Sequence, residues 1–164
     1  MLKLNKIIIN IDGSSQGNPG PSGISTIFAT ETGEILSEVY KYIGEGTNNQ
    51  AEYRALIIAL EMLKVKHLNW SLKAHTEIEI KTDSELLFNQ VNGSYKVKDW
   101  GLKKLYSQVL KLKKDLPNFK MVLIPREENR ACDKLAKKAI KDTMKKYSIK
   151  SKDANIGKPQ RLFS

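Results

Sequence analysis

The sequence has little of what builds disulfides, zinc sites or membrane spans. Among 164 residues it has one cysteine, Cys132, and two histidines, which excludes an internal disulfide and leaves too few ligands for a zinc tetrad. Its apolar runs are short, such as residues 55–60, whereas a membrane-spanning helix needs roughly 18 residues. No signal-peptide pattern precedes the first apolar run. We therefore expect a cytoplasmic protein that does not contact membranes and whose metal sites use oxygen ligands.

Positive charge is abundant and unevenly distributed. The formal net charge is +10, from 28 Lys and Arg against 18 Asp and Glu. Residues 96–120 carry a net +6 and residues 134–164 a net +8, while the rest of the chain is mildly acidic. Segregated positive charge is typical of proteins that bind a polyanion, usually nucleic acid. Two solvated helix faces would give the same pattern, so charge alone does not decide.

The spacing of apolar residues predicts a single α/β domain. Strand-like runs cover residues 6–12, 23–30, 35–43, 77–82 and 120–124, and helical patterns cover about 47–64, 84–91, 102–116 and 128–147. Short turns between the first three strands favour antiparallel pairing, and the later strands alternate with helices. We expect a mixed sheet covered by helices within residues 1–147, with residues 148–164 as a basic tail. Residues 13–21 are predicted to be a loop, and Pro117 to end the third helix.

Local signals also mark the first and last predicted helices. Thr47 and Gln50 can form a capping box at the start of the first helix. The apolar stripe expected to pack the first helix on the sheet consists of Leu56, Ala59, Leu60 and Leu63. The stripe of the last helix consists of Leu135, Ala136, Ala139, Ile140 and Met144.

Four acids stand at comparable places in these predicted elements. Asp12 and Asp83 end the first and fourth strands, whereas Glu52 and Asp133 lie in the opening turns of two helices. Open α/β sheets place sites at the carboxyl ends of strands, so we expect these acids to gather at one edge. Clustered carboxylates repel one another unless cations neutralise them, and an all-oxygen set favours Mg²⁺ or Mn²⁺. Two such ions suit phosphodiester hydrolysis, although each acid taken singly fits a cap or surface role.

The sequence resembles the type 1 ribonuclease H family in four motifs, which occur in the right order over residues 6–147. They are DGSSQGNPGP (12–21), TNNQAE (47–52), TDS (82–84) and REENRACDKLA (126–136). The resemblance implies the ribonuclease H fold, a five-stranded mixed sheet of three antiparallel strands followed by parallel strands, with helices on both faces. It also implies endonucleolytic cleavage of the RNA strand of RNA–DNA hybrids, leaving 5′-phosphate and 3′-hydroxyl ends.

The resemblance also assigns roles to individual residues. The four acids match the catalytic, metal-binding carboxylates of the family, of which Asp12 bridges two Mg²⁺ ions when substrate is bound, with Mn²⁺ as the alternative. Amide groups can both donate to and accept from a ribose 2′-OH, which distinguishes RNA from DNA. The residues expected to contact the hybrid at this edge are Gly13, Ser14, Asn18, Asn48, Asn49 and Ser84.

The chain lacks a histidine that many bacterial members carry between the last strand and the last helix. Residues 124–127 make this connection directly, and His67 and His75 both precede the fourth strand. Arg126 can supply a cation near the phosphate, but an arginine cannot carry a proton at neutral pH. Steps that depend on this histidine are therefore not expected to proceed in the same way.

The chain also lacks the basic helix that some members insert before the third helix. Residues 93–101 are too few for that insertion. One interpretation is that Lys96, Lys98 and Trp100 form a small platform instead, with the lysines on phosphates and the indole stacked on a sugar or base. Alternatively, Trp100 packs beneath the helix that follows.

Three other functions remain alternatives to a monomeric, hybrid-specific ribonuclease. The first is a nuclease of the same fold that acts on double-stranded RNA or branched DNA. The second is a non-catalytic nucleic-acid-binding module, against which the four acids argue because a bare acidic cluster repels phosphate. The third is acid–base hydrolysis of a substrate such as a glycoside, which only a pair of carboxylates supports.

Overall fold

A computed structural model describes residues 4–66, 75–116 and 118–156. Within these residues the chain forms one five-stranded sheet, of strand order β3-β2-β1-β4-β5, together with the helices that cover it. In chain order the elements are β1 (Lys6–Ser15), β2 (Gly20–Thr30), β3 (Ile35–Gly46), α1 (Asn48–Lys66), β4 (Glu77–Thr82), α2 (Glu85–Val91), α3 (Trp100–Lys114), β5 (Phe119–Leu123), the short 3₁₀ helix η1 (Arg126–Asn129) and α4 (Arg130–Ile156).

The sheet is mixed, as predicted. β1, β2 and β3 pair antiparallel, whereas β4 runs parallel to both β1 and β5. In the β1–β4 pair Asn10 is opposite Lys81. Asp12 and Asp83 each follow two residues later, so both emerge at the same edge of the sheet.

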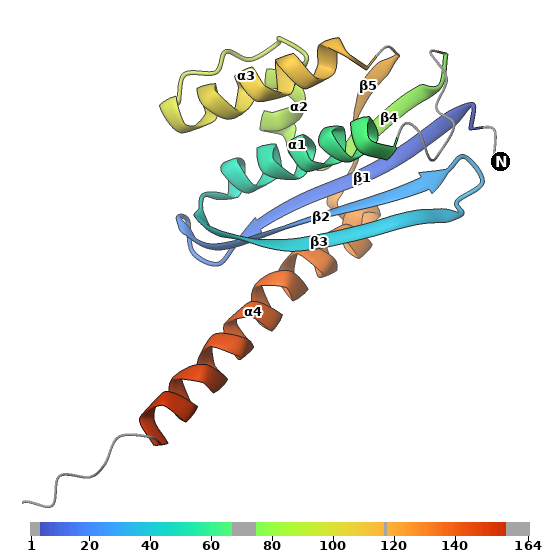
Figure 1. The fold of residues 1–164 in the computed structure, drawn as a ribbon. Coiled ribbons are helices and arrows are strands. Elements are labelled where there is room, and N and C mark those ends of the chain that lie inside the picture. Colours follow the sequence, from blue (N-terminus) through green and yellow to red (C-terminus); the bar gives the residue numbers. More distant parts are fainter. Residues whose placement is uncertain (1–3, 67–74, 117, 157–164) are drawn as a thin grey trace, which may run out of the picture.

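Helices cover both faces of the sheet (Figure 1). α1 packs on β1 and β2, and α3 packs on α1, whereas α4 crosses the opposite face beneath β1, β2 and β3. The predicted apolar stripe of α1 is fully buried against the sheet; its members are Leu56, Ala59, Leu60 and Leu63. No helix in the described part of the chain is both long and apolar enough to cross a membrane.

Two predicted boundaries are wrong. Residues 13–21 are mostly strand, because β1 continues to Ser15 and β2 already begins at Gly20. Their small side chains do not hinder the backbone pairing, and Gln16 N–H still donates to the Pro21 carbonyl at 2.8 Å. α4 extends to Ile156 instead of ending near residue 147, since no glycine or proline interrupts residues 148–156. Pro117, which we expected to end α3, lies outside the described residues, as does His67.

Candidate functional site

A cleft of about 330 Å³ opens where β1 and β4 end and where α1 and α4 begin. It brings together ten of the thirteen residues predicted for the site. Its lining consists of Asp12, Gly13, Ser14, Asn48, Asn49, Glu52, Asp83, Ser84, Arg126, Asp133 and Lys137. The predicted residues outside it are Asn18, Lys96 and Trp100.

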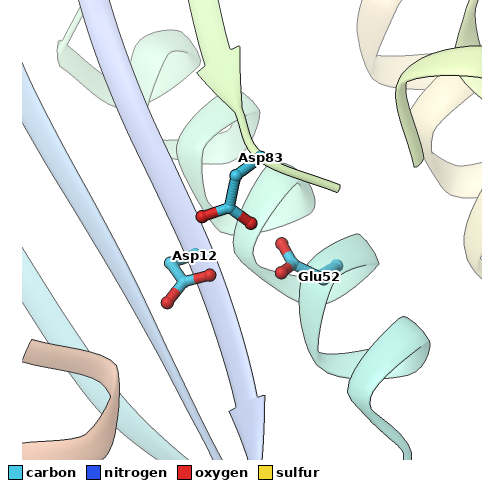
Figure 2. A group of neighbouring side chains, drawn as sticks. All are labelled: Asp12, Glu52 and Asp83. Atoms are coloured by element: carbon cyan, nitrogen blue, oxygen red, sulfur yellow. The ribbon is translucent and has the colours of Figure 1, made fainter. Parts of the chain in front are cut away.

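Three carboxylates converge at the bottom of this cleft (Figure 2). One oxygen from each of Asp12, Glu52 and Asp83 lies within 4.8 Å of the others. Asp12 and Glu52 are only 4% and 7% exposed, and Asp83 is half-buried. Asp83 follows the end of β4 and Glu52 lies in the opening turns of α1, as their sequence positions predicted. Asp12 instead lies within β1, three residues before the strand ends at Ser15.

Glu52 reaches the strand ends because α1 lies directly on the backbone of Gly13. A Cβ atom at Gly13 would stand 2.2 Å from the Ala51 carbonyl carbon and 2.4 Å from the Glu52 nitrogen. Side-chain capping fixes where the helix begins. Thr47 Oγ1 accepts from Gln50 N–H at 3.1 Å, and Gln50 Oε1 accepts from Thr47 N–H at 3.0 Å, which is the reciprocal capping box that the sequence predicted.

The acid cluster holds more negative charge than its surroundings neutralise. Burial, followed by the charge of Asp83, raises the pKa of Asp12 to about 7. Burial also raises the pKa of Glu52 well above its ordinary value, and the charges of Asp12 and Asp83 add to this effect. Glu52 Oε2 is buried without a hydrogen-bond partner. These oxygens fit a hard divalent cation, which would supply the positive charge and the missing partner.

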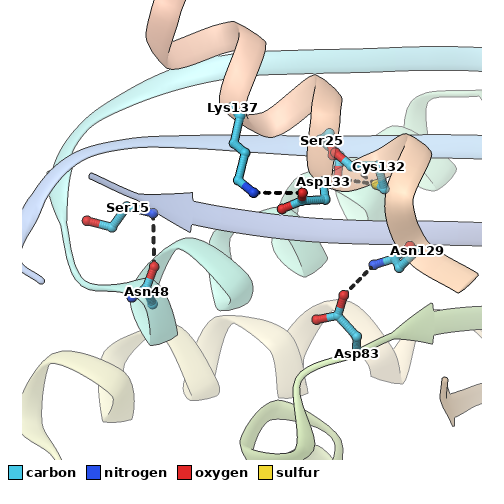
Figure 3. Close-up of polar contacts among 8 residues, drawn as sticks. All are labelled: Ser15, Ser25, Asn48, Asp83, Asn129, Cys132, Asp133 and Lys137. Carbon is cyan, nitrogen blue, oxygen red and sulfur yellow. Dashed lines mark hydrogen bonds and ion pairs between the residues drawn. The ribbon is translucent and has the colours of Figure 1, made fainter. Parts of the chain in front are cut away.

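Asp133 lies on the wall of the cleft, outside the three-acid group. It is close enough to contribute to the raised pKa of Asp12. Its carboxylate binds Lys137 Nζ at 2.8 Å (Figure 3). Lys137 was not among the predicted site residues, although its position four residues after Asp133 on one helix was a usable signal. The cleft therefore carries cations, Lys137 and Arg126, on its rim beside the acids.

Asn129 is a second residue whose role was not predicted, although it lies in the last motif. Its side chain is buried, and its amide nitrogen donates to Asp83 Oδ2 at 3.2 Å and to the Ile11 carbonyl at 2.9 Å. Its amide oxygen accepts from Asn10 Nδ2 at 3.0 Å. Asn129 thus holds Asp83 in place against β1 (Figure 3). Sequence alone could not reveal these contacts, because they join residues far apart in the chain.

The hairpin turn after β1 is tied to the start of α1 through amide side chains. Asn48 Oδ1 accepts from Ser15 N–H at 3.0 Å (Figure 3), and Asn18 Oδ1 accepts from Asn48 N–H at 3.1 Å. Asn18 therefore stands next to the cleft residue Asn48 without lining the cleft itself.

Cys132 is buried on the other side of the sheet, where Ser25 Oγ lies 2.8 Å from its sulfur. It therefore packs α4 against β2.

Lys96 and Trp100 lie outside the cleft. Trp100 is 85% exposed, so the alternative that it packs beneath α3 is wrong. Lys103 Nζ stands 5.2 Å from the centre of the indole ring, within the range of a cation–π contact. The first turn of α3 thus presents an exposed aromatic ring flanked by a lysine.

Comparisons with known proteins agree on the family. The profile of the family described as reverse transcriptase-like matches residues 10–139. The ribonuclease H of Prosthecochloris aestuarii is 30% identical over 154 residues, which cover 84% of this chain and 97% of the relative. This chain belongs to the type 1 ribonuclease H family. LC11-RNase H1, isolated from compost, was solved in complex with an RNA/DNA hybrid; it is 42% identical, with a TM-score of 0.78 over 84% of this chain and 99% of that one.

Some relatives of this ribonuclease H family member are much longer. The bifunctional protein Rv2228c of Mycobacterium tuberculosis is 36% identical over 137 residues, which cover 82% of this chain and 35% of the relative. The chain thus spans about a third of the length of the mycobacterial relatives it matches. Among the described residues, no helix stands between α2 and α3, and η1 joins β5 to α4 without a histidine.

Proposed function

We propose that this protein is a metal-dependent endoribonuclease that hydrolyses the RNA strand of RNA–DNA hybrids and leaves 5′-phosphate and 3′-hydroxyl ends. The main support is that Asp12, Glu52 and Asp83 converge in a cleft that Arg126 and Lys137 also line. Glu52 Oε2 is buried there without a hydrogen-bond partner. The hybrid found with LC11-RNase H1 supports the choice of substrate. The catalytic domain would comprise residues 1–147, with residues 148–164 as a basic extension.

The donor set fits Mg²⁺, with Mn²⁺ as the alternative. Asp12, Glu52 and Asp83 would hold the ions, and Asp133 would complete the set once Lys137 releases it. Hard divalent cations prefer carboxylate oxygens and keep several waters. Two such ions supply an activated water and stabilise the leaving oxygen in an in-line displacement at phosphorus.

The protein's own side chains would orient the hybrid. Arg126 and Lys137 stand on the rim, where charge-assisted hydrogen bonds to phosphate oxygens position the strand. The amides of Asn18 and Asn48 are fixed by the hydrogen bonds described above, so they are already in place to meet a ribose 2′-OH. Asn49 adds a third amide. The remaining contacts at the acid edge would come from Gly13, Ser14 and Ser84.

The second strand of the hybrid would pass over the start of α3. Trp100 offers an exposed ring for stacking, and Lys96 and Lys103 are cations on the same segment. Stacking on an aromatic ring does not depend on base sequence. This arrangement fits an enzyme that accepts hybrids of many sequences.

The test is cleavage of four labelled substrates of one sequence at one salt concentration: RNA–DNA hybrid, double-stranded RNA, single-stranded RNA and branched DNA. We expect cleavage of the hybrid with Mg²⁺ and none with EDTA. Asp12→Asn and Asp83→Asn each remove a charged oxygen ligand, so each should lower the rate by at least about a hundredfold while the circular dichroism spectrum stays native. Preference for double-stranded RNA or branched DNA would establish the alternative nuclease. Near-normal cleavage by Asp12→Asn would overturn the metal assignment.

A further inference from the structure

The last helix continues far beyond the sheet on which it packs. α4 has 27 residues, which makes it about 40 Å long. Ala136, Ala139 and Ile140 are buried against the sheet, whereas every residue from Lys145 to Asp153 is exposed. Figure 1 shows this second half projecting away from the other elements. The family profile ends at residue 139, so the projecting half is additional to the part that defines the family.

The lysines of α4 are concentrated on one side of the helix. At about 100° per residue, five of them fall within a sector about 80° wide. This lysine face consists of Lys134, Lys137, Lys141, Lys145 and Lys152. Both acids of the projecting part, Asp142 and Asp153, fall outside the sector. Lys146 and Lys150 point to the opposite side of the same helix.

The lysine face begins at the acid cleft. Lys137 lines the cleft, and Lys141 and Lys145 follow one and two turns later, with about 6 Å between successive members of these three and about 10 Å from Lys145 to Lys152. Each strand of a duplex carries one phosphate per roughly 3.4 Å of axis, so one lysine would serve about two phosphates. From Lys137 to Lys152 the row is about 22 Å long, which corresponds to roughly six or seven base pairs.

Most of the positive charge of this face has no ion-pair partner among the described residues. Among the described residues, the pair Lys137–Asp133 is the only ion pair that α4 makes. Lysines four residues apart repel one another and destabilise an isolated helix, and a helix without packing lacks its usual source of stability. A merely solvated helix face usually intersperses acids with its lysines. A polyanion lying along the face would remove the repulsion.

We propose that the lysine face of α4 binds the phosphodiester backbone of the duplex outside the cleft. The segment of duplex that the protein contacts would then be longer by more than half a helical turn. The proposal rests on the proposed function, because it takes the duplex in the cleft to be an RNA–DNA hybrid. In this chain the connection between α2 and α3 is too short to hold a basic helix. The proposal therefore assigns the binding of the duplex backbone to α4. Backbone contacts carry no sequence information, so the gain is in affinity and not in sequence preference.

Two double variants of equal charge provide the test. Lys141→Gln with Lys145→Gln alters the lysine face, and Lys146→Gln with Lys150→Gln removes the same charge from the other side of the helix. Fluorescein-labelled hybrids of about 8 and 20 base pairs would be titrated with Ca²⁺ in place of Mg²⁺ and followed by fluorescence anisotropy. For the lysine-face variant we expect about tenfold weaker binding of the long hybrid and a salt slope smaller by about two. The short hybrid, and the control variant with either hybrid, should change less than about twofold.

The outcomes separate the two proposals. If both double variants bind the long hybrid equally, or if the lysine-face variant weakens both hybrids alike, the role of the lysine face is refuted while wild-type cleavage of hybrid still supports the proposed function. If the wild type neither binds nor cleaves the hybrid, the proposed function itself fails. The single-turnover cleavage rate at saturating long hybrid should be the same in all three proteins, since none of the four lysines lines the cleft. Circular dichroism checks that both variants keep α4 helical.

Discussion

At the scale of single residues, the position of Asp83 depends on a buried amide. The Ile11 carbonyl can only accept a hydrogen bond, so the nitrogen of the Asn129 side chain must face it, and the same nitrogen then donates to Asp83. This leaves the Asn129 oxygen toward Asn10, whose amide donates to it. The orientation of the whole relay is thus set by chemistry, and its end point is a carboxylate of the acid cluster.

Replacing Asn129 should loosen Asp83 and weaken the metal site. Loss of a residue that orients a metal ligand typically lowers metal affinity or activity about 10- to 100-fold, and we expect this range for Asn129→Ala. The half-saturating Mg²⁺ concentration for hybrid cleavage should rise, and Mn²⁺ binding followed by electron paramagnetic resonance should weaken in parallel. Asn10→Ala reaches the cluster only through Asn129 and should have a smaller effect of the same kind. A loss of thermal stability with unchanged Mn²⁺ binding would show that Asn129 is merely structural.

The sequence predicted the residues of the cleft better than the contacts between them. Glu52, Asp83 and Asp133 could be found because each stands near the end of a recognisable element, and Asp12 because it follows the apolar run that begins β1. The link from Asn129 to Asp83 spans 46 residues, and the parallel pairings of β4 with β1 and with β5 bring such positions together. Three acids form the closest group because the carboxylate of Asp133 binds Lys137, a contact for which the i,i+4 spacing was the local signal.

At the scale of elements, the site depends on how closely α1 approaches β1. The absence of a side chain at Gly13 lets the helix backbone lie on the strand, and Glu52 follows from that contact. A similar contact holds the other face of the sheet, where a Cβ at Gly23 would stand 2.4 Å from the Ala136 carbonyl oxygen of α4. The two helices that deliver Glu52 and Asp133 are therefore both positioned through glycine.

A methyl group at Gly13 should separate α1 from the sheet and move Glu52. The backbone atoms in its way cannot rotate aside, so Gly13→Ala should cost about 1–3 kcal/mol of unfolding free energy and lower the rate of hybrid cleavage at least about tenfold, because even a 1 Å displacement of a catalytic group is costly. Gly46→Ala is a matched control, since its nearest neighbour, Gln50 Oε1, stands 3.3 Å away. Urea unfolding and single-turnover kinetics measure the two effects. Unchanged kinetics in Gly13→Ala would show that Glu52 does not depend on this contact.

Element boundaries show where prediction from sequence stops. The strand β4 and the capping box of α1 were predicted correctly, because alternation and capping are local signals. The hairpin between β1 and β2 was predicted as a long loop from its Gly and Pro content, yet pairing with β2 continues through Ser14 and Ser15. The end of α4 was set too early because only its apolar stripe was followed, and lysines can continue a helix that has no apolar face.

At the scale of the whole molecule, a strongly basic protein contains a buried acidic centre. The net charge of +10 attracts phosphate over a distance limited by salt, since exposed charges are screened within about 8–10 Å at moderate ionic strength. The acids act at contact distance and need metal before a phosphate can approach them. In the proposed function, lysines on α3 and α4 would favour encounter with nucleic acid, and the cleft would carry out the reaction.

The acidic centre should make the metal-free protein less stable as the pH rises. In the fold the pKa of Asp12 is about 7, against an ordinary value of 3.8, so between these values the folded protein keeps a proton that the unfolded chain has released. The stability from this proton is fully present below about pH 4 and is lost as the pH rises to about 7. The difference amounts to about 4 kcal/mol, and Glu52 acts in the same direction.

Asp12→Asn removes this ionisation and should stabilise the metal-free fold at high pH. In urea unfolding with EDTA, the variant should exceed the wild type by about 4 kcal/mol at pH 8 and by less than about 2 kcal/mol at pH 5. Mg²⁺ should raise the stability of the wild type at pH 8, because it binds the folded state alone, and should stabilise the variant much less. If the difference in unfolding free energy between the two proteins is the same at both pH values, Asp12 ionises normally. Repulsion and burial in the acid cluster would then destabilise the fold less than the burial of Asp12 indicates. If the difference in unfolding free energy shrinks at pH 5, it measures how much the ionised acid cluster destabilises the metal-free fold. Stabilisation of the wild type by Mg²⁺ at pH 8 would then show that the cation offsets this destabilisation.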